Sequence, residues 1–197
     1  MRYYLIILVG LWFGGCSVTK PPLTEYSIDI NLPIIESTSK ECSLKSIKVA
    51  QSFSSNKLKT LNMNYAQDNT KIYTYSLSVW AESPNDAITS QVVKILREKK
   101  IFNNVQISRS RAKSDFILEV NIEKFIQSFN KDLTNSYADV FITFSLIDAK
   151  TNKVIASQNF KAKEGALGDA NGGVKALTNA LSTVLVKSTD WLEEVCR

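Results

Sequence analysis

The three cysteines, Cys16, Cys42 and Cys196, are the residues of this 197-residue chain best able to form covalent bonds. The chain contains no histidine, so it lacks the commonest general base, the usual partner of a serine or cysteine nucleophile, and the commonest metal ligand. No pair of carboxylates resembles a glycosidase site, and no glycine-rich loop has the spacing that binds phosphate. The composition therefore predicts a protein that is not an enzyme and that holds no metal or cofactor.

Cys16 stands at the end of a segment typical of exported lipoproteins. A single arginine leads an apolar run over residues 3–13, and Gly14-Gly15-Cys16 follows. The run is shorter than the roughly 20 residues that span a bilayer, and it has the length of a signal-peptide apolar region. The junction resembles a lipobox, which predicts removal of residues 1–15 and acylation of Cys16. An ordinary signal peptide and an N-terminal membrane anchor are the two alternatives.

The predicted lipid places the rest of the chain at a membrane surface. Each buried CH₂ adds about 0.8 kcal/mol, so one acyl chain binds reversibly whereas three hold almost permanently. Phe13 departs from the lipobox, where leucine is usual. Ser17 follows the cysteine where an aspartate commonly retains lipoproteins in the inner membrane, so it favours the outer membrane. Residues 16–23 hold two prolines, and we expect a short tether before a domain over residues 24–197.

Cys42 and Cys196 remain after the lipidated cysteine is set aside. An exported, oxidising compartment favours disulfides, and two leftover thiols most simply pair with each other. The bond would tie the C-terminal helix to the first core strand. Because the closed loop would be very long, the chain-entropy model gives a stabilisation on the order of 4–5 kcal/mol. Two buried free thiols are the alternative.

The net charge is modest, at +5 from 24 basic and 19 acidic residues, and it is spread along the chain. The densest cluster, residues 97–100, includes a glutamate and stands at a predicted helix end, where cations complement the dipole. We interpret it as a solvated helix end and expect no nucleic-acid partner. Hydrophobic residues make up 44% and charged residues 22%, an ordinary globular composition.

Apolar periodicity predicts an α+β fold, a two-layer sandwich in which two helices pack on a mainly antiparallel sheet. Ser83 is the expected N-cap of the first helix, with Pro84 in its first turn. Residues 165–173 are small and polar and predict a mobile loop. The predicted strands cover residues 24–31, 44–49, 61–66, 71–80, 105–107, 114–125, 137–148 and 153–161, and the helices cover 84–99 and 174–195.

Several aromatic residues permit two interpretations. Trp80, Tyr73, Tyr75 and Phe141 could line a lipid-binding groove, but aromatic residues at strand ends usually pack in the core, which we favour. Trp191 on the last helix could anchor an interface, since tryptophan is common at hot spots. We expect it to pack between the helix and the sheet instead.

The order and spacing of several segments resemble one known family. Trp80-Ala81-Glu82-Ser83-Pro84 is close to a Trp-x-Glu/Asp-x-Pro pattern before a helix, although the family often has a second proline where Ser83 stands. The other matching segments are the early strand with Tyr26, Ile47 to Val49, Leu61 to Tyr65, Phe102 to Val105, Phe116 to Phe125, Ala138 to Leu146 and Val154 to Phe160. Together with the lipobox, they make the chain similar to the ABC-type transport auxiliary lipoprotein component family.

The resemblance implies a role in transport. Members of this family accompany lipid-transport systems that contain a membrane ABC transporter and a periplasmic Mce-type protein. It implies a lipoprotein on the periplasmic face of the outer membrane that docks the Mce-type partner, and it admits a homo-oligomer. The alternative is a structural or assembly lipoprotein of the outer membrane, of the kind that helps barrels assemble or activates peptidoglycan synthases.

Overall fold

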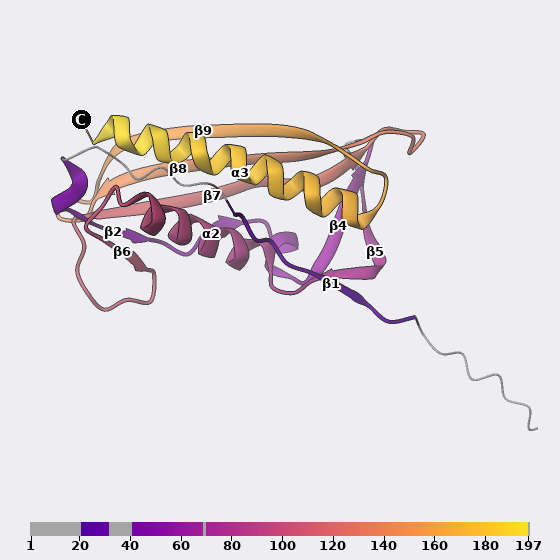
Figure 1. The fold of residues 1–197 in the computed structure, drawn as a ribbon, viewed down its shortest axis with the longest axis horizontal. Helices are drawn as coiled ribbons and strands as arrows, with labels where there is room; N and C mark the ends of the chain where they lie inside the picture. Colours follow the sequence, from indigo (N-terminus) through magenta and orange to yellow (C-terminus); the bar gives the residue numbers. More distant parts are fainter. Residues whose placement is uncertain (1–20, 32–40, 69, 197) are drawn as a thin grey trace, which may run out of the picture.

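The computed structural model describes residues 21–31, 41–68 and 70–196 (Figure 1), so Cys16 lies outside the described residues. No helix in these ranges combines the length and apolar character needed to cross a membrane. In chain order the elements are β1 (Thr24–Tyr26), η2 (Cys42–Leu44), β2 (Ser46–Val49), β3 (Phe53–Ser54), η3 (Asn56–Lys59), β4 (Asn62–Gln67), β5 (Lys71–Trp80), α2 (Pro84–Lys99), β6 (Asn104–Ile107), β7 (Phe116–Phe129), β8 (Ser136–Asp148), β9 (Lys153–Ala166) and α3 (Ala170–Val195).

The long strand β7 organises a mixed sheet. One edge of β7 pairs antiparallel with β8 along the whole length of β7. On its other side β8 pairs antiparallel with β9, and these two strands form the predicted hairpin. The other edge of β7 is shared by β2, β3 and β4, all parallel to it, and β6, β5 and β1 lie farther out. The longest pairings, β7 with β8 and β8 with β9, are antiparallel, but five of the eight described pairings are parallel, so the sheet is mixed where a mainly antiparallel one was expected. Alternating polarity identifies a strand but does not give its direction.

Both helices pack against this sheet and lie side by side in Figure 1. The side chain of Ser83 accepts a hydrogen bond from the Asp86 amide at 3.2 Å, which confirms the predicted N-cap of α2. Burial alternates along β8, where every second residue from Ala138 to Leu146 is buried. One side of that strand therefore faces the helices, as its apolar alternation predicted.

The predicted mobile loop over residues 165–173 is wrong. Strand β9 continues to Ala166, and α3 begins at Ala170 after Asp169, whose side chain caps the helix at 2.6 Å from the Gly172 amide. Gly173 lies inside the helix, where a Cβ atom would overlap the amide oxygen of Gln127 on β7. The glycine at this position lets the helix approach the sheet closely. The local sequence does not show whether a glycine serves close packing or a flexible loop.

We predict that Trp80→Ala damages folding. The indole is 4% exposed, and its ring lies 6.0 Å from that of Phe125, centroid to centroid. Truncating a buried tryptophan costs about 3–5 kcal/mol, a large share of the roughly 5–15 kcal/mol of a typical domain. Thermal melts of Trp80→Ala check this, with Trp191→Ala, at a half-buried tryptophan, as the comparison. An unchanged melting temperature with lost partner binding would make Trp80 an interface residue.

Candidate functional site

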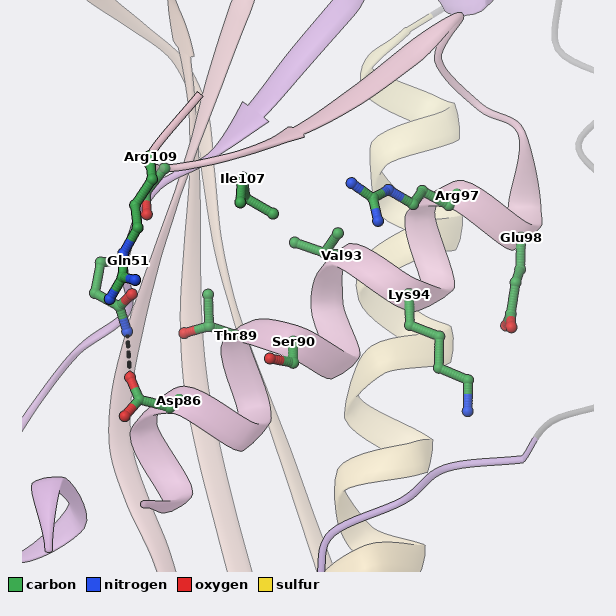
Figure 2. Close-up of a pocket in the computed structure, with 11 residues that line it drawn as sticks. Gln51, Asp86, Thr89, Ser90, Val93, Lys94, Arg97, Glu98, Ile107 and Arg109 are labelled. Carbon is green, nitrogen blue, oxygen red and sulfur yellow. Dashed lines mark hydrogen bonds between the residues drawn. The ribbon is translucent and has the colours of Figure 1, made fainter. Parts of the chain in front are cut away.

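A groove of about 580 Å³ with a mostly polar lining runs along α2 (Figure 2), and several of its side chains form hydrogen bonds within the fold. Asp86 accepts a hydrogen bond from the Gln51 amide at 2.9 Å, and the Arg97 guanidinium donates to the Val105 carbonyl at 3.2 Å. The Thr89 hydroxyl bonds to the Asn85 carbonyl and to the Ser52 hydroxyl, both at 2.7 Å, so it is engaged within the fold. Across the described ranges, no group of three or more Cys, Asp or Glu side chains is placed to hold a metal ion.

A second cavity, of about 600 Å³, lies at the end of the sheet where β2 and β7 begin and β8 ends. Its charged lining residues are Lys45, Lys48, Lys113, Asp115, Asp148 and Lys150. These are four ammonium groups against two carboxylates. We call this group of six residues the lysine cavity.

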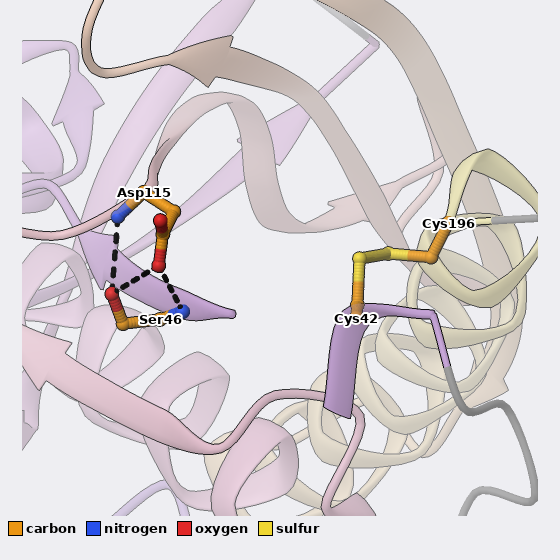
Figure 3. The surroundings of a disulfide bond; sticks show 4 residues. All are labelled: Cys42, Ser46, Asp115 and Cys196. Atoms are coloured by element: carbon orange, nitrogen blue, oxygen red, sulfur yellow. Dashed lines mark hydrogen bonds between the residues drawn. A yellow bond between two sulfur atoms is a disulfide. The ribbon is translucent and has the colours of Figure 1, made fainter. Parts of the chain in front are cut away.

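The two carboxylates of the lysine cavity are held ionised by local hydrogen bonds. Asp115 accepts from the amide of Ser46 at 2.7 Å and from its hydroxyl at 2.8 Å (Figure 3), and these bonds lower the pKa of Asp115. The amide and hydroxyl of Thr151 likewise lower the pKa of Asp148. Both aspartates are therefore negative near neutral pH. The cavity keeps an excess of two positive charges, which suits an anionic partner.

The structure joins Cys42 and Cys196 near the same end of the sheet (Figure 3). Their Cα atoms are 5.6 Å apart, and both residues are buried. Cys42 lies in η2, just before the first core strand, and Cys196 caps α3. The bond therefore closes a loop of 154 residues and connects the last helix to the start of β2, as the sequence suggested.

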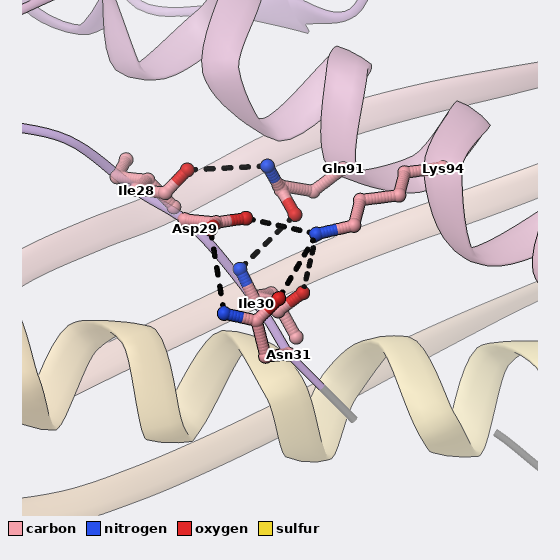
Figure 4. Close-up of polar contacts among 6 residues, drawn as sticks. All are labelled: Ile28, Asp29, Ile30, Asn31, Gln91 and Lys94. Atoms are coloured by element: carbon pink, nitrogen blue, oxygen red, sulfur yellow. Dashed lines mark hydrogen bonds and ion pairs between the residues drawn. The ribbon is translucent and has the colours of Figure 1, made fainter. Parts of the chain in front are cut away.

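The segment after the expected tether is fastened to α2 (Figure 4). The side-chain amide of Gln91 accepts from the Ile30 amide at 3.2 Å and donates to the Ile28 carbonyl at 3.1 Å. Lys94 pairs with Asp29 at 2.9 Å and lowers the pKa of that carboxyl. Only Thr24–Tyr26 of the predicted strand over residues 24–31 forms a strand. After it, the backbone of Ile28 and Ile30 bonds to the Gln91 side chain instead of to a neighbouring strand.

The aromatic residues considered for a groove do not gather at one site. Trp80 contacts Phe125, whereas Phe141 lies beneath the ammonium group of Lys161 at 4.1 Å. Tyr75 donates to the side chain of the buried Gln127 at 2.9 Å, and burial raises the pKa of Tyr75 to about 12. Trp80, Tyr75 and Phe141 therefore pack against other side chains, whereas Tyr73 is exposed and stacks on the ring of Tyr65.

Trp191 also packs as expected. Its ring meets Phe160 of β9 edge-on, with centroids 6.1 Å apart, so it joins helix to sheet. Sequence reasoning missed two features that depend on distant residues. One is the lysine cavity, built from three separate stretches of chain. The other is the Gln127 amide, which donates to Ser136 and to the Leu167 carbonyl. A polar residue in an apolar strand was the only sequence signal for Gln127.

The described residues thus form an α+β domain with a polar groove along α2 and the lysine cavity, and no catalytic constellation is found among them. The model of the ABC-type transport auxiliary lipoprotein component family matches residues 32–187. The chain therefore belongs to that family, as its motifs suggested. A comparison with curated proteins found no match.

Solved structures show how widely this fold occurs. A Xanthomonas campestris protein of the family model DUF330 superposes with a TM-score of 0.77 at 16% identity, over 87% of this chain and 96% of that chain. A hypothetical protein from Chlamydia trachomatis gives a TM-score of 0.53 at 7% identity, over 78% and 98% of the two chains. At such identities the likeness shows the fold alone.

Proposed function

We propose that this protein is the accessory lipoprotein of an ABC/Mce-type lipid-transport system. It is anchored to the periplasmic face of the outer membrane through Cys16 and docks the periplasmic Mce-type component. It binds this partner without turning over a substrate. The family match over residues 32–187 carries the proposal, and the missing histidine supports a binding role over catalysis.

The shape of the domain supports a docking role for the lysine cavity. The described chain begins beside β1 at one end of the long axis, whereas β2 and β6 lie toward the other end (Figure 1). A tether of residues 16–23 reaches at most about 27 Å. The anchored end therefore stays near the membrane, and the lysine cavity, where β2 begins, lies toward the opposite end of the domain. Tethering also raises the effective concentration for a partner that bridges from the opposite membrane, so weak binding suffices.

We predict that Lys45→Glu/Lys113→Glu weakens capture of the Mce-type partner. Both lysines are exposed, so the substitution reverses charge without disturbing the core. Loss of electrostatic complementarity slows association, and we expect roughly tenfold weaker binding at low salt, with the difference shrinking as salt rises. Pull-downs of the full lipoprotein with the Mce-type protein of the same host measure this. Lys187→Glu, on an exposed position of α3, is the matched control.

Two results would contradict the proposal, one for the docking surface and one for the function as a whole. Equal losses for the Lys45/Lys113 and Lys187 variants would remove the lysine cavity as the docking surface. No capture by the wild type, together with an intact outer-membrane lipid barrier in a deletion strain, would favour the alternative function of an assembly lipoprotein.

A further inference from the structure

A narrow cavity opens where two short strands diverge along one edge of β7. Strand β3 pairs with β7 at Asn121 and Ile122, and β4 pairs with it only from Gln127 onward. Among the described strands, residues 124–126 of β7 have a partner on the β8 side alone, and the register shifts beside them. A cavity of about 230 Å³ lies at this gap in the sheet.

The buried lining of this cavity is mostly apolar, with Ser128 as its polar member, and the exposed lining carries charged side chains. Trp80, Phe125 and Leu177 contribute to it, and each is 4% exposed. The rim carries two cations, Lys57 and Lys124. Glu123 adds one carboxylate at the opening. Apolar side chains within and an ammonium group at the opening match an amphiphile with an apolar tail and an anionic head.

The charged groups at the rim differ in whether they already have a partner. Lys124 pairs with Asp139 at 3.3 Å but remains 57% exposed, and Glu123 accepts a hydrogen bond from Thr143 at 2.7 Å. Among the described residues, no carboxylate pairs with Lys57, which is exposed on η3. Lys57 is therefore the cation available to an anionic head group.

We propose that this cavity binds one acyl chain of an anionic amphiphile. Its volume of about 230 Å³ falls below the roughly 300–1,000 Å³ of ordinary ligand sites, so it admits one narrow chain and leaves the head group at the rim. The inference deepens the proposed function, on which it rests for its source of lipid: the accessory protein itself holds part of the transported molecule.

The cavity lies at the anchored end of the domain. Trp80 is the register partner of Tyr26 on β1, which follows Cys16 by ten residues. Ten residues span at most about 35 Å, so the anchor keeps Tyr26 and the neighbouring Trp80 within about that distance of the membrane.

Brominated fatty acid quenches a tryptophan that it touches, and the mature chain has two tryptophans, Trp80 and Trp191. The purified full-length lipoprotein, moved from detergent into an amphipathic polymer, is titrated with dibromostearate. In Trp191→Phe, where Trp80 is the reporter, we expect saturable loss of emission. In Trp80→Phe, where Trp191 is the reporter, we expect none. Quenching of neither or of both reporters would overturn the proposal.

Two variants test the rim and the interior in the Trp191→Phe background. Lys57→Glu is expected to raise the dissociation constant about tenfold, the equivalent of about 1.4 kcal/mol, whereas Lys59→Glu, two residues along η3 and outside the cavity, leaves it unchanged. Ala66→Leu fills the buried interior and abolishes quenching. If circular dichroism shows that Ala66→Leu does not fold, the comparison of Lys57→Glu with Lys59→Glu alone tests the proposal. Equal dissociation constants for the two lysine variants would overturn the proposal.

The occupant is exchangeable lipid rather than the acyl group on Cys16. The same titration is repeated on a chain exported with an ordinary signal peptide, which leaves Cys16 without lipid. Quenching only in that unacylated chain would assign the cavity to the anchor and overturn the proposal. Because these titrations use no partner protein, their failure leaves the docking proposal untouched, and a failed pull-down leaves the acyl-chain site untouched.

Discussion

Cys16→Ser is expected to release the protein from the membrane fraction into the soluble fraction. Three acyl chains on Cys16 would hold the domain almost permanently, because each buried CH₂ contributes about 0.8 kcal/mol. The variant has no thiol to acylate at the Gly14-Gly15 junction. Fractionation of cells, with separation of inner and outer membranes, measures the loss and also tests the outer-membrane location that Ser17 favours.

A matched control separates lipidation from cysteine loss in general. Cys42→Ser also removes one cysteine, but it stands in η2 and far along the chain from the lipobox, so we expect that variant to stay membrane-bound. If Cys16→Ser still pellets with outer membranes as the wild type does, the lipid-anchor hypothesis fails. Radiolabelled fatty acid should enter the wild type and the Cys42 variant but not Cys16→Ser.

Removing the Cys42–Cys196 bond is expected to produce the largest loss of stability. The bond closes a loop of 154 residues, for which the chain-entropy model predicts a stabilisation of about 5 kcal/mol. In a domain of this size the melting temperature should fall by roughly 10–20 °C. Cys42→Ala/Cys196→Ala is the better variant, because both positions are buried and alanine leaves no unpaired polar group there.

The bond is checked directly by mass spectrometry of protein purified from the periplasm without reductant. The expected chain is lighter than its reduced form by two hydrogens and is not alkylated at Cys42 or Cys196. Two alkylatable thiols in the folded protein would support the free-thiol alternative. The reduced wild type and the double alanine variant should have the same melting temperature, since both lack only the cross-link.

The sequence determined those features that depend on near neighbours in the chain. Alternating apolar residues located β7 and β8, because successive side chains on a strand face opposite sides. The Ser83-Pro84 pair located the start of α2, because the cap and the first turn lie within four residues. The Gly14-Gly15-Cys16 junction and the family motifs are equally local, and the family match over residues 32–187 confirms the latter.

Only the tertiary structure decided how the strands are directed and what their ends bring together. Polarity patterns are the same for parallel and antiparallel partners, so the three parallel strands that share one edge of β7 left no signal. The same holds for Gly173, whose missing side chain matters only because Gln127 lies against it. The lysine cavity and the narrow cavity beside Trp80 each combine residues far apart in sequence. Such features depend on long-range packing, which no local pattern records.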